Sequence, residues 1–177
     1  GFKYRWIRAE VLGQADTNFG YGLSFTNSNS GVSITTINNS GTISGVAGTS
    51  DANGISSFVR DTGTINNSGT ISAVATTQVS YGLRLYSIFG GADITNLNNS
   101  GTISASSGTT SSYGVYLNSY YDEAEIVNFT NTGTISSSVG SGSDVFDIFV
   151  DTGSGMGGEN TITCLLYTSD AADEWLR

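Results

Sequence analysis

One eight-residue motif recurs four times in this chain, and its spacing constrains the fold more than any other feature. The motif reads INNSGTIS twice, LNNSGTIS once and FTNTGTIS once. Its glycines are Gly41, Gly69, Gly101 and Gly133, which gives a period of roughly 30 residues. Self-similarity at such a period indicates a repeat architecture in which each unit packs on its neighbours.

A second motif alternates with the first. It reads YGLSF, NGISS, YGLRL and YGVYL, and a degenerate copy without glycine follows; these copies start at Tyr21, Asn53, Tyr81, Tyr113 and Asp144. The step from a first-motif glycine to the next second-motif glycine is constant: Gly41 to Gly54, Gly69 to Gly82 and Gly101 to Gly114. The return step is shorter from Gly54 to Gly69 than in the other repeats. One part of the repeat therefore has a fixed length, and the other contains a loop of variable length, as solenoids allow.

Each repeat contains three short segments with the period-2 alternation of strands. The segments are exemplified by GTIS, by YGLRL and by DITNLNN, the last with a spacing of three between apolar residues that implies a bend or bulge. We therefore predict an all-β fold: a right-handed three-sided parallel β-helix (β-solenoid) of about four rungs, each of roughly 28–32 residues. An antiparallel sandwich is the alternative, but it has no reason to repeat one motif at fixed offsets.

Like residues should stack on like residues in this fold, forming structural ladders along the axis. The predicted ladders contain one amide, one aliphatic and one glycine position per rung: Asn39, Asn67, Asn99 and Asn131; Ile43, Ile71, Ile103 and Ile135; and Gly41, Gly69, Gly101 and Gly133. An asparagine ladder would satisfy backbone and side-chain amides at a corner. The glycines are expected to adopt a positive φ in the turn that follows.

Composition excludes several functional classes. The chain has 15 acidic and 6 basic residues, a net charge of −9, which argues against nucleic acid and anionic lipid as partners. No apolar run is long enough to cross a bilayer as a helix, so we expect no direct membrane insertion of this segment. There is no histidine and a single cysteine, Cys164, so a metal site, a cofactor and an internal disulfide are not expected.

The spaced INNSGTIS and YGL units, over about residues 20–150, resemble the passenger repeats of bacterial autotransporters and related surface adhesins. The resemblance implies a passenger that is exported and displayed outside the cell, anchored in the outer membrane through a C-terminal β-barrel. This chain contains no such barrel, so the barrel would be a missing domain of a longer protein.

The two ends of the chain depart from the repeat pattern. Residues 164–174 read CLLYTSDAADE, which resembles the conceptual translation of a sequencing-library adapter. The alternative is a genuine helix that caps the solenoid. We divide the chain into residues 1–19, an N-terminal segment or degenerate rung, residues 20–163, the β-helix repeat domain, and residues 164–177, a tail that we predict to be an artefact.

Two acidic groups are candidate chemical sites. Asp122, Glu123 and Glu125 share one loop, with Asp93 one rung away, and a pair of these carboxylates could act as acid and base on a polysaccharide. Asp144, Asp147 and Asp151 suggest calcium, although the GGxGxD repeat of calcium-binding β-rolls is absent. Both groups are more readily read as solvated surface charge, so we expect no catalytic residue and no enzyme.

Aromatic and hydroxyl side chains are the other candidates. Tyr86, Tyr116, Tyr120 and Tyr121 crowd the second motif and its following loop, beside the repeated Tyr21, Tyr81 and Tyr113, and they could contact sugar rings or a protein partner. Packing at a strand edge is the simpler interpretation. The outward rows Thr42, Thr70, Thr102, Thr134 and Ser44, Ser72, Ser104, Ser136 resemble the T-x-T faces of ice-binding β-helices, but suit any exposed strand.

The sequence thus predicts a fragment of an exported, surface-displayed passenger with a structural or adhesive role, extracellular and contacting cell-surface glycans or proteins. Two alternatives stay open: a β-helix lyase or glycosidase, and an ice- or surface-binding solenoid.

Overall fold

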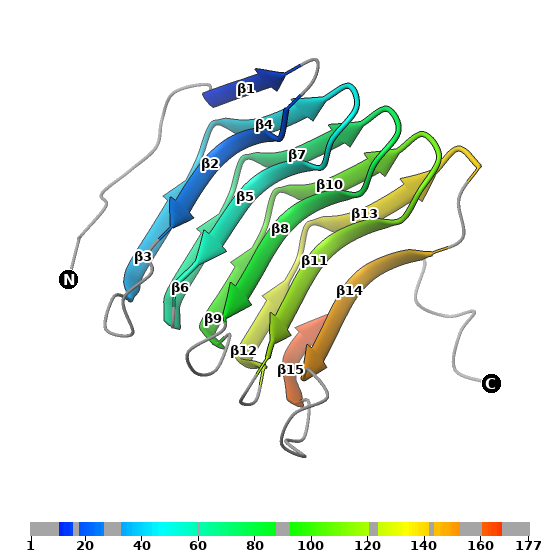
Figure 1. The fold of residues 1–177 in the computed structure, drawn as a ribbon. Coiled ribbons are helices and arrows are strands. Elements are labelled where there is room, and N and C mark those ends of the chain that lie inside the picture. Colours follow the sequence, from blue (N-terminus) through cyan, green and yellow to red (C-terminus); the bar gives the residue numbers. More distant parts are fainter. Residues whose placement is uncertain are drawn as a thin grey trace.

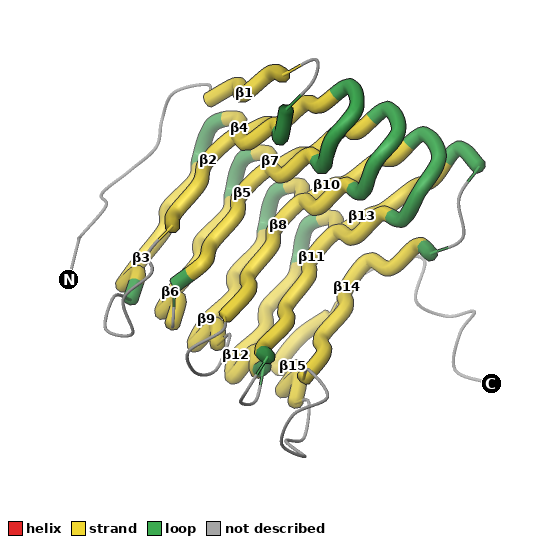
Figure 2. The backbone as a smooth tube through the Cα atoms, viewed as in Figure 1, coloured by secondary structure: helices red, strands yellow, loops and turns green. Residues whose placement is uncertain are grey.

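The computed structural model describes residues 11–15, 18–26, 33–59, 61–87, 93–120, 124–141, 144–152 and 161–167. Its strands coil into a parallel β-solenoid with three sheets, each of which receives one strand from every turn (Figures 1 and 2). The predicted three-sided, all-β solenoid of about four turns is confirmed. Among the described residues there is no helix of the length and apolar character needed to span a membrane.

Sheet 1 carries the GTIS segments. Its five strands lie in the order β1 (Val11–Ala15), β4 (Thr42–Ala47), β7 (Thr70–Ala75), β10 (Thr102–Ser107) and β13 (Thr134–Val139). Equivalent residues pair directly, so that Ile43, Ile71, Ile103 and Ile135 form one stacked row. Residues 11–15, in the predicted N-terminal segment, add a strand in register with β4.

Sheet 2 carries the YGL segments. In order along the axis, its strands are β2 (Gly20–Thr26), β5 (Ala52–Phe58), β8 (Ser80–Ser87), β11 (Ser112–Ser119) and β14 (Val145–Thr152). In β11 the alternation of inward and outward side chains is interrupted beside the second-motif glycine. Gly114 and Val115 are both buried, whereas Tyr113 and Tyr116 are partly exposed. Tyr113 and Tyr116 therefore share the outer face.

Sheet 3 carries the segments that precede each NSG. Its strands are β3 (Ile34–Asn39), β6 (Asp61–Asn67), β9 (Asp93–Asn99), β12 (Glu125–Asn131) and β15 (Thr161–Tyr167). The predicted irregularity is present, because the pairing passes from Ile126–Ile94 to Asn128–Asn96 without the residues between them. The strand β15 continues past residue 163, and its pairing with β12 shifts register around Cys164.

The interior is filled by the inward residues of all three sheets. The largest fully buried side chains include Phe129, Ile65, Leu83 and Ile103. Sheets 1 and 2 converge at one corner, where a separate cluster contains only small side chains: Ala47, Ala52, Ala73 and Ala75. A Cβ atom at Gly45 would lie 2.0 Å from the Asn53 carbonyl oxygen, so this turn has no room for a side chain at the position that Ala73 occupies in the next turn.

The expected positive φ at the NSG glycines is wrong for Gly69, Gly101 and Gly133, whose φ angles lie outside that range. Glycine is needed there for a different reason, which is close stacking of successive turns. A Cβ atom at Gly101 would lie 2.0 Å from the carbonyl oxygen of Gly69, and Gly133 stands in the same relation to Gly101. Turns one strand spacing apart, about 4.8 Å, leave no room for a methyl group pointing along the axis.

The second turn differs from the others in length and in its core. Only Val59 and Arg60 separate β5 from β6, and Val59 joins the apolar core. Two positions that are apolar in neighbouring turns are polar in this one: Ser57 pairs with Leu85, and Thr62 pairs with Ile34 and Ile94. Both hydroxyl groups are buried without a hydrogen-bond partner.

Candidate functional site

The corner after sheet 3 is built on a continuous asparagine ladder. Asn39 Nδ2 donates to Asn67 Oδ1 at 2.8 Å, Asn67 to Asn99 at 2.7 Å, and Asn99 to Asn131 at 2.7 Å. The first three amide nitrogens also donate to backbone carbonyl oxygens of the following turn, namely those of Thr70, Thr102 and Thr134. All four side chains are at most 2% exposed. This inner ladder links each turn to the next through both side chain and backbone.

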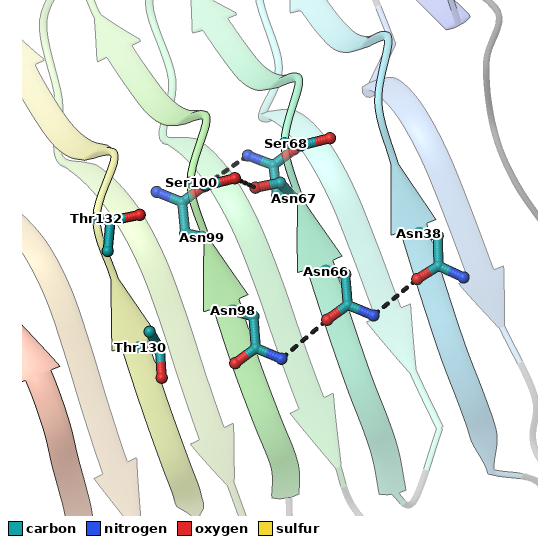
Figure 3. A pocket seen from close by; sticks show the side chains of 9 residues that line it. All are labelled: Asn38, Asn66, Asn67, Ser68, Asn98, Asn99, Ser100, Thr130 and Thr132. Carbon is teal, nitrogen blue, oxygen red and sulfur yellow. Dashed lines mark hydrogen bonds between the residues drawn. The ribbon is translucent and has the colours of Figure 1, made fainter.

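A second ladder lies one residue earlier on the outer face of sheet 3. Asn98 Nδ2 donates to Asn66 Oδ1 at 2.8 Å, and Asn66 Nδ2 donates to Asn38 Oδ1 at 2.7 Å. This outer ladder runs in the opposite direction to the inner one, and its recorded bonds reach no backbone group (Figure 3). On the following turn, Thr130 occupies the position in register with Asn98.

A groove with a volume of about 350 Å³ lies along this corner. Its walls are the outer ladder, the hydroxyl side chains of the turn and two amides of the inner ladder: Asn38, Asn66, Asn98 and Thr130; Ser68, Ser100 and Thr132; and Asn67 and Asn99 (Figure 3). All nine side chains are neutral and carry an amide or a hydroxyl group. The site therefore presents hydrogen-bonding groups at strand spacing without charge.

Sequence reasoning identified the inner asparagines but not the outer ones. The signal was present as the paired asparagines of INN and LNN, because adjacent residues of a strand point to opposite faces. The buried member of each pair supports the fold, and the other faces solvent.

The outer face of sheet 2 carries stacked aromatic rings. Tyr81 stacks on Tyr113 at 5.4 Å between ring centroids, and Tyr113 on Phe146 at 5.9 Å, each with an interplanar angle of 10°. In the neighbouring column Tyr116 stacks on Phe149 at 5.4 Å and 9°. Because the rings stack along the solenoid axis, their faces cover one another and it is largely their edges that point outward.

Arg84, on β8, lies at the end of the column of Tyr116 and Phe149 that faces the second turn. Its guanidinium lies 4.5 Å from the ring centroid of Tyr81 and 5.5 Å from that of Phe58, and it pairs with Asp51 at 3.9 Å. Burial raises the pKa of Tyr81 to about 12, against an opposing effect of Arg84. Burial likewise raises the pKa of Tyr116. The cation thus serves to complete an aromatic cluster.

The four predicted ligand-contact tyrosines do not appear as one set. Tyr116 lies inside the stacked cluster, and Tyr86 packs edge-on against Phe58 at 5.6 Å. Tyr120, just after β11, is 49% exposed, and Tyr121 lies outside the described residues. Tyr116 contacts the rings of Tyr113 and Phe149, and the role of these tyrosines in ligand contact stays a prediction.

The two acidic groups are arranged differently. Asp93 and Glu125 begin β9 and β12, each directly before the paired residues Ile94 and Ile126, so they lie at equivalent positions of neighbouring turns, whereas Asp122 and Glu123 lie outside the described residues. The carboxylates of residues 144, 147 and 151 accept hydrogen bonds from three different residues: Ser111, Ser137 and Asn118. Within the described part of the chain no three potential metal ligands come together.

The hydroxyl rows of sheet 1 are in register over four turns, with Thr42, Thr70, Thr102 and Thr134 in one row and Ser44, Ser72, Ser104 and Ser136 in the next. Ser72 Oγ donates to Ser44 Oγ at 3.0 Å. The next outward row starts with Val46 and Val74, and Val74 is 46% exposed. The polar rows are therefore narrow.

Comparison with known proteins adds no identification: no family model, no curated protein and no solved structure matches this chain.

Proposed function

We propose that this chain is a segment of an exported, autotransporter-like passenger that is displayed on a bacterial surface and acts as a structural or adhesive rod. The observation that supports the proposal most strongly is the in-register stacking of equivalent residues in all three sheets. A solenoid of this kind extends by adding turns, and each added turn repeats the same surface groups farther along the axis. Such a body suits projection of repeated binding groups away from an anchor.

The resemblance of the INNSGTIS and YGL units to passenger repeats gives this proposal its cellular context. An acidic, hydroxyl- and amide-rich exterior agrees with display in solvent, since exposed charge and polarity limit edge-to-edge association. The inner ladder links successive turns through hydrogen bonds between side chains, which suits a body that folds outside the cell after export.

We also propose that residues 164–177 derive from adapter sequence and are not part of the native protein. The peptide string CLLYTSDAADE supports this proposal, because it departs abruptly from the repeat pattern and resembles translated adapter sequence.

One experiment tests both proposals: sequencing of the source locus from DNA that carries no adapter. We expect the reading frame to leave the present sequence near codon 164, to continue through more NSGTIS turns and to end in an outer-membrane β-barrel. A genomic frame that encodes CLLYTSDAADE would refute the adapter origin. A complete gene with neither an export signal nor a translocating domain would refute the passenger proposal.

A further inference from the structure

We propose that the groove beside the outer asparagine ladder binds an extended, uncharged polysaccharide chain that lies along the solenoid axis. The inference deepens the adhesive role proposed above and depends on it for its biological setting. It assigns the adhesive contact to the outer face of sheet 3 and its corner, away from the tyrosines of sheet 2.

Unused hydrogen-bonding capacity is the first argument. A primary amide has two N–H donors and an oxygen that accepts two hydrogen bonds. Asn66, which lines the groove, uses one donor toward Asn38 and one lone pair toward Asn98, so one donor and one lone pair are left for a ligand. The hydroxyls of Ser68 and Ser100 donate weakly, at 3.3 and 3.5 Å, to the carbonyls of Asn39 and Asn67, which leaves their oxygens as acceptors.

The second argument is that the outer ladder makes fewer bonds to the fold than the inner ladder does. The inner asparagines bond to the backbone of the next turn, whereas the outer ones bond only to each other. Asn98 is exposed, and water could replace its bond to Asn66. A second outward row of the same sheet repeats the arrangement, because Asn128 Nδ2 donates to Asn96 Oδ1 at 3.0 Å and Asn96 Nδ2 to Thr64 Oγ1 at 3.0 Å.

Charge and period select the class of ligand. The lining contains no ionisable side chain, and the chain as a whole carries −9, so a sulfated or carboxylated polymer would be repelled. The polar groups recur once per turn at about 4.8 Å, which favours a polymer that offers hydroxyl groups at every unit of an extended chain. Ordered hydroxyl–amide networks of this kind give specificity even when part of the contact is through water.

The aromatic face is less suited to this ligand. Sugar rings bind to open faces of aromatic side chains, but the faces of Tyr113 are covered by Tyr81 and Phe146. Tyr116 is covered on one face by Phe149 and meets Tyr113 edge-on. The groove offers unoccupied donors and acceptors, whereas the interior of the aromatic stack offers few.

The test is titration of the full chain, labelled with ¹⁵N, with three neutral hexasaccharides (cellohexaose, chitohexaose and mannohexaose) and with a hyaluronan hexasaccharide as the charged comparison. Side-chain amide signals of Asn38, Asn66 and Asn98 are expected to shift with at least one neutral hexasaccharide and not with hyaluronan. The double variant Asn66→Ala/Asn98→Ala should bind about tenfold more weakly, equivalent to about 1.4 kcal/mol. Asn118→Ala, the same substitution on sheet 2, is the matched control and should bind like the parent.

Three results would overturn the inference: no shift with any neutral hexasaccharide, unchanged affinity in the double variant, or tighter binding of hyaluronan. Shifts confined to signals around Tyr116 would place the ligand on the aromatic face and would also overturn it. Circular dichroism and unfolding midpoints show whether each variant is folded, and Ser68→Ala/Ser100→Ala is a second variant if the first is not. The passenger proposal is tested separately, by the sequence of the source locus, so a negative binding result would refute only the polysaccharide proposal.

Discussion

Replacement of Asn67 by alanine should destabilise the protein far more than replacement of its neighbour Asn66. Asn67 accepts a hydrogen bond from Asn39 and donates to Asn99 Oδ1 and to the Thr102 carbonyl, with distances of 2.8, 2.7 and 3.0 Å. Three hydrogen bonds at about 1 kcal/mol each contribute about 3 kcal/mol. The Asn99 oxygen would be left buried without this donor, adding about 1–2 kcal/mol, for a total of about 4–5 kcal/mol.

Asn66→Ala is the matched control, because it removes the same side chain one position away. Asn66 makes two side-chain bonds, both within the outer ladder, and water can replace them. Its loss should cost less than about 1 kcal/mol, as usual for substitutions near the surface.

Equilibrium unfolding in urea measures both free energies, provided that the slopes are equal. Equal losses in the two variants, or a loss below about 1 kcal/mol for Asn67→Ala, would show that the inner ladder does not hold the turns together. A double-mutant cycle of Asn67→Ala with Asn99→Ala then gives their coupling energy, which should be nonzero because the two side chains share a bond.

Three further predictions concern Thr62, Gly101 and Tyr81. Thr62→Val should raise the free energy of unfolding by about 1 kcal/mol in the same urea assay, because the buried hydroxyl has no hydrogen-bond partner and valine has nearly the same shape. Destabilisation by this substitution would mean that the hydroxyl is bonded to a buried water. Gly101→Ala should lower the free energy of unfolding by about 2 kcal/mol or more, since the added Cβ would lie 2.0 Å from the Gly69 carbonyl oxygen. The control Ser100→Ala should leave the urea midpoint nearly unchanged. An unchanged midpoint in Gly101→Ala would contradict the close stacking of the turns. Burial raises the pKa of Tyr81 from 10.0 to about 12, so the unfolded state loses this proton first and stability should fall as pH rises from about 10 to 12. Burial also raises the pKa of Tyr116, so absorbance at alkaline pH should show more than one late-titrating tyrosine, and Tyr81→Phe should remove one of them. An unchanged late-titrating absorbance in Tyr81→Phe would contradict the assignment.

The fold could be predicted because each sequence repeat forms one turn of the solenoid. In a parallel solenoid, a period in sequence becomes a neighbour in space, and motifs such as those at Ile43 and Ile71 therefore predict both strand pairing and register. The asparagine ladder followed from the same logic.

Other features depended on distances that periodicity does not encode. The glycine of NSG was expected to serve a left-handed turn, but the structure shows that the carbonyl of the preceding turn excludes a side chain at Gly101. Tyr113 and Tyr116 share one face only because the strand slips at Gly114. Arg84 lies over the ring of Tyr81 and is in register with Ser56 of the neighbouring turn. No single motif predicts this contact.

The measurement that tests the surface-displayed passenger most directly is protease treatment of intact cells of the organism that encodes the chain, followed by mass spectrometry. Trypsin cleavage at Arg60 and Arg84 defines a diagnostic peptide, residues 61–84. The account predicts that this peptide is released from intact cells, together with peptides of adjoining solenoid turns, before any cytoplasmic marker appears. Recovery of the peptide only after the cells are lysed would contradict it.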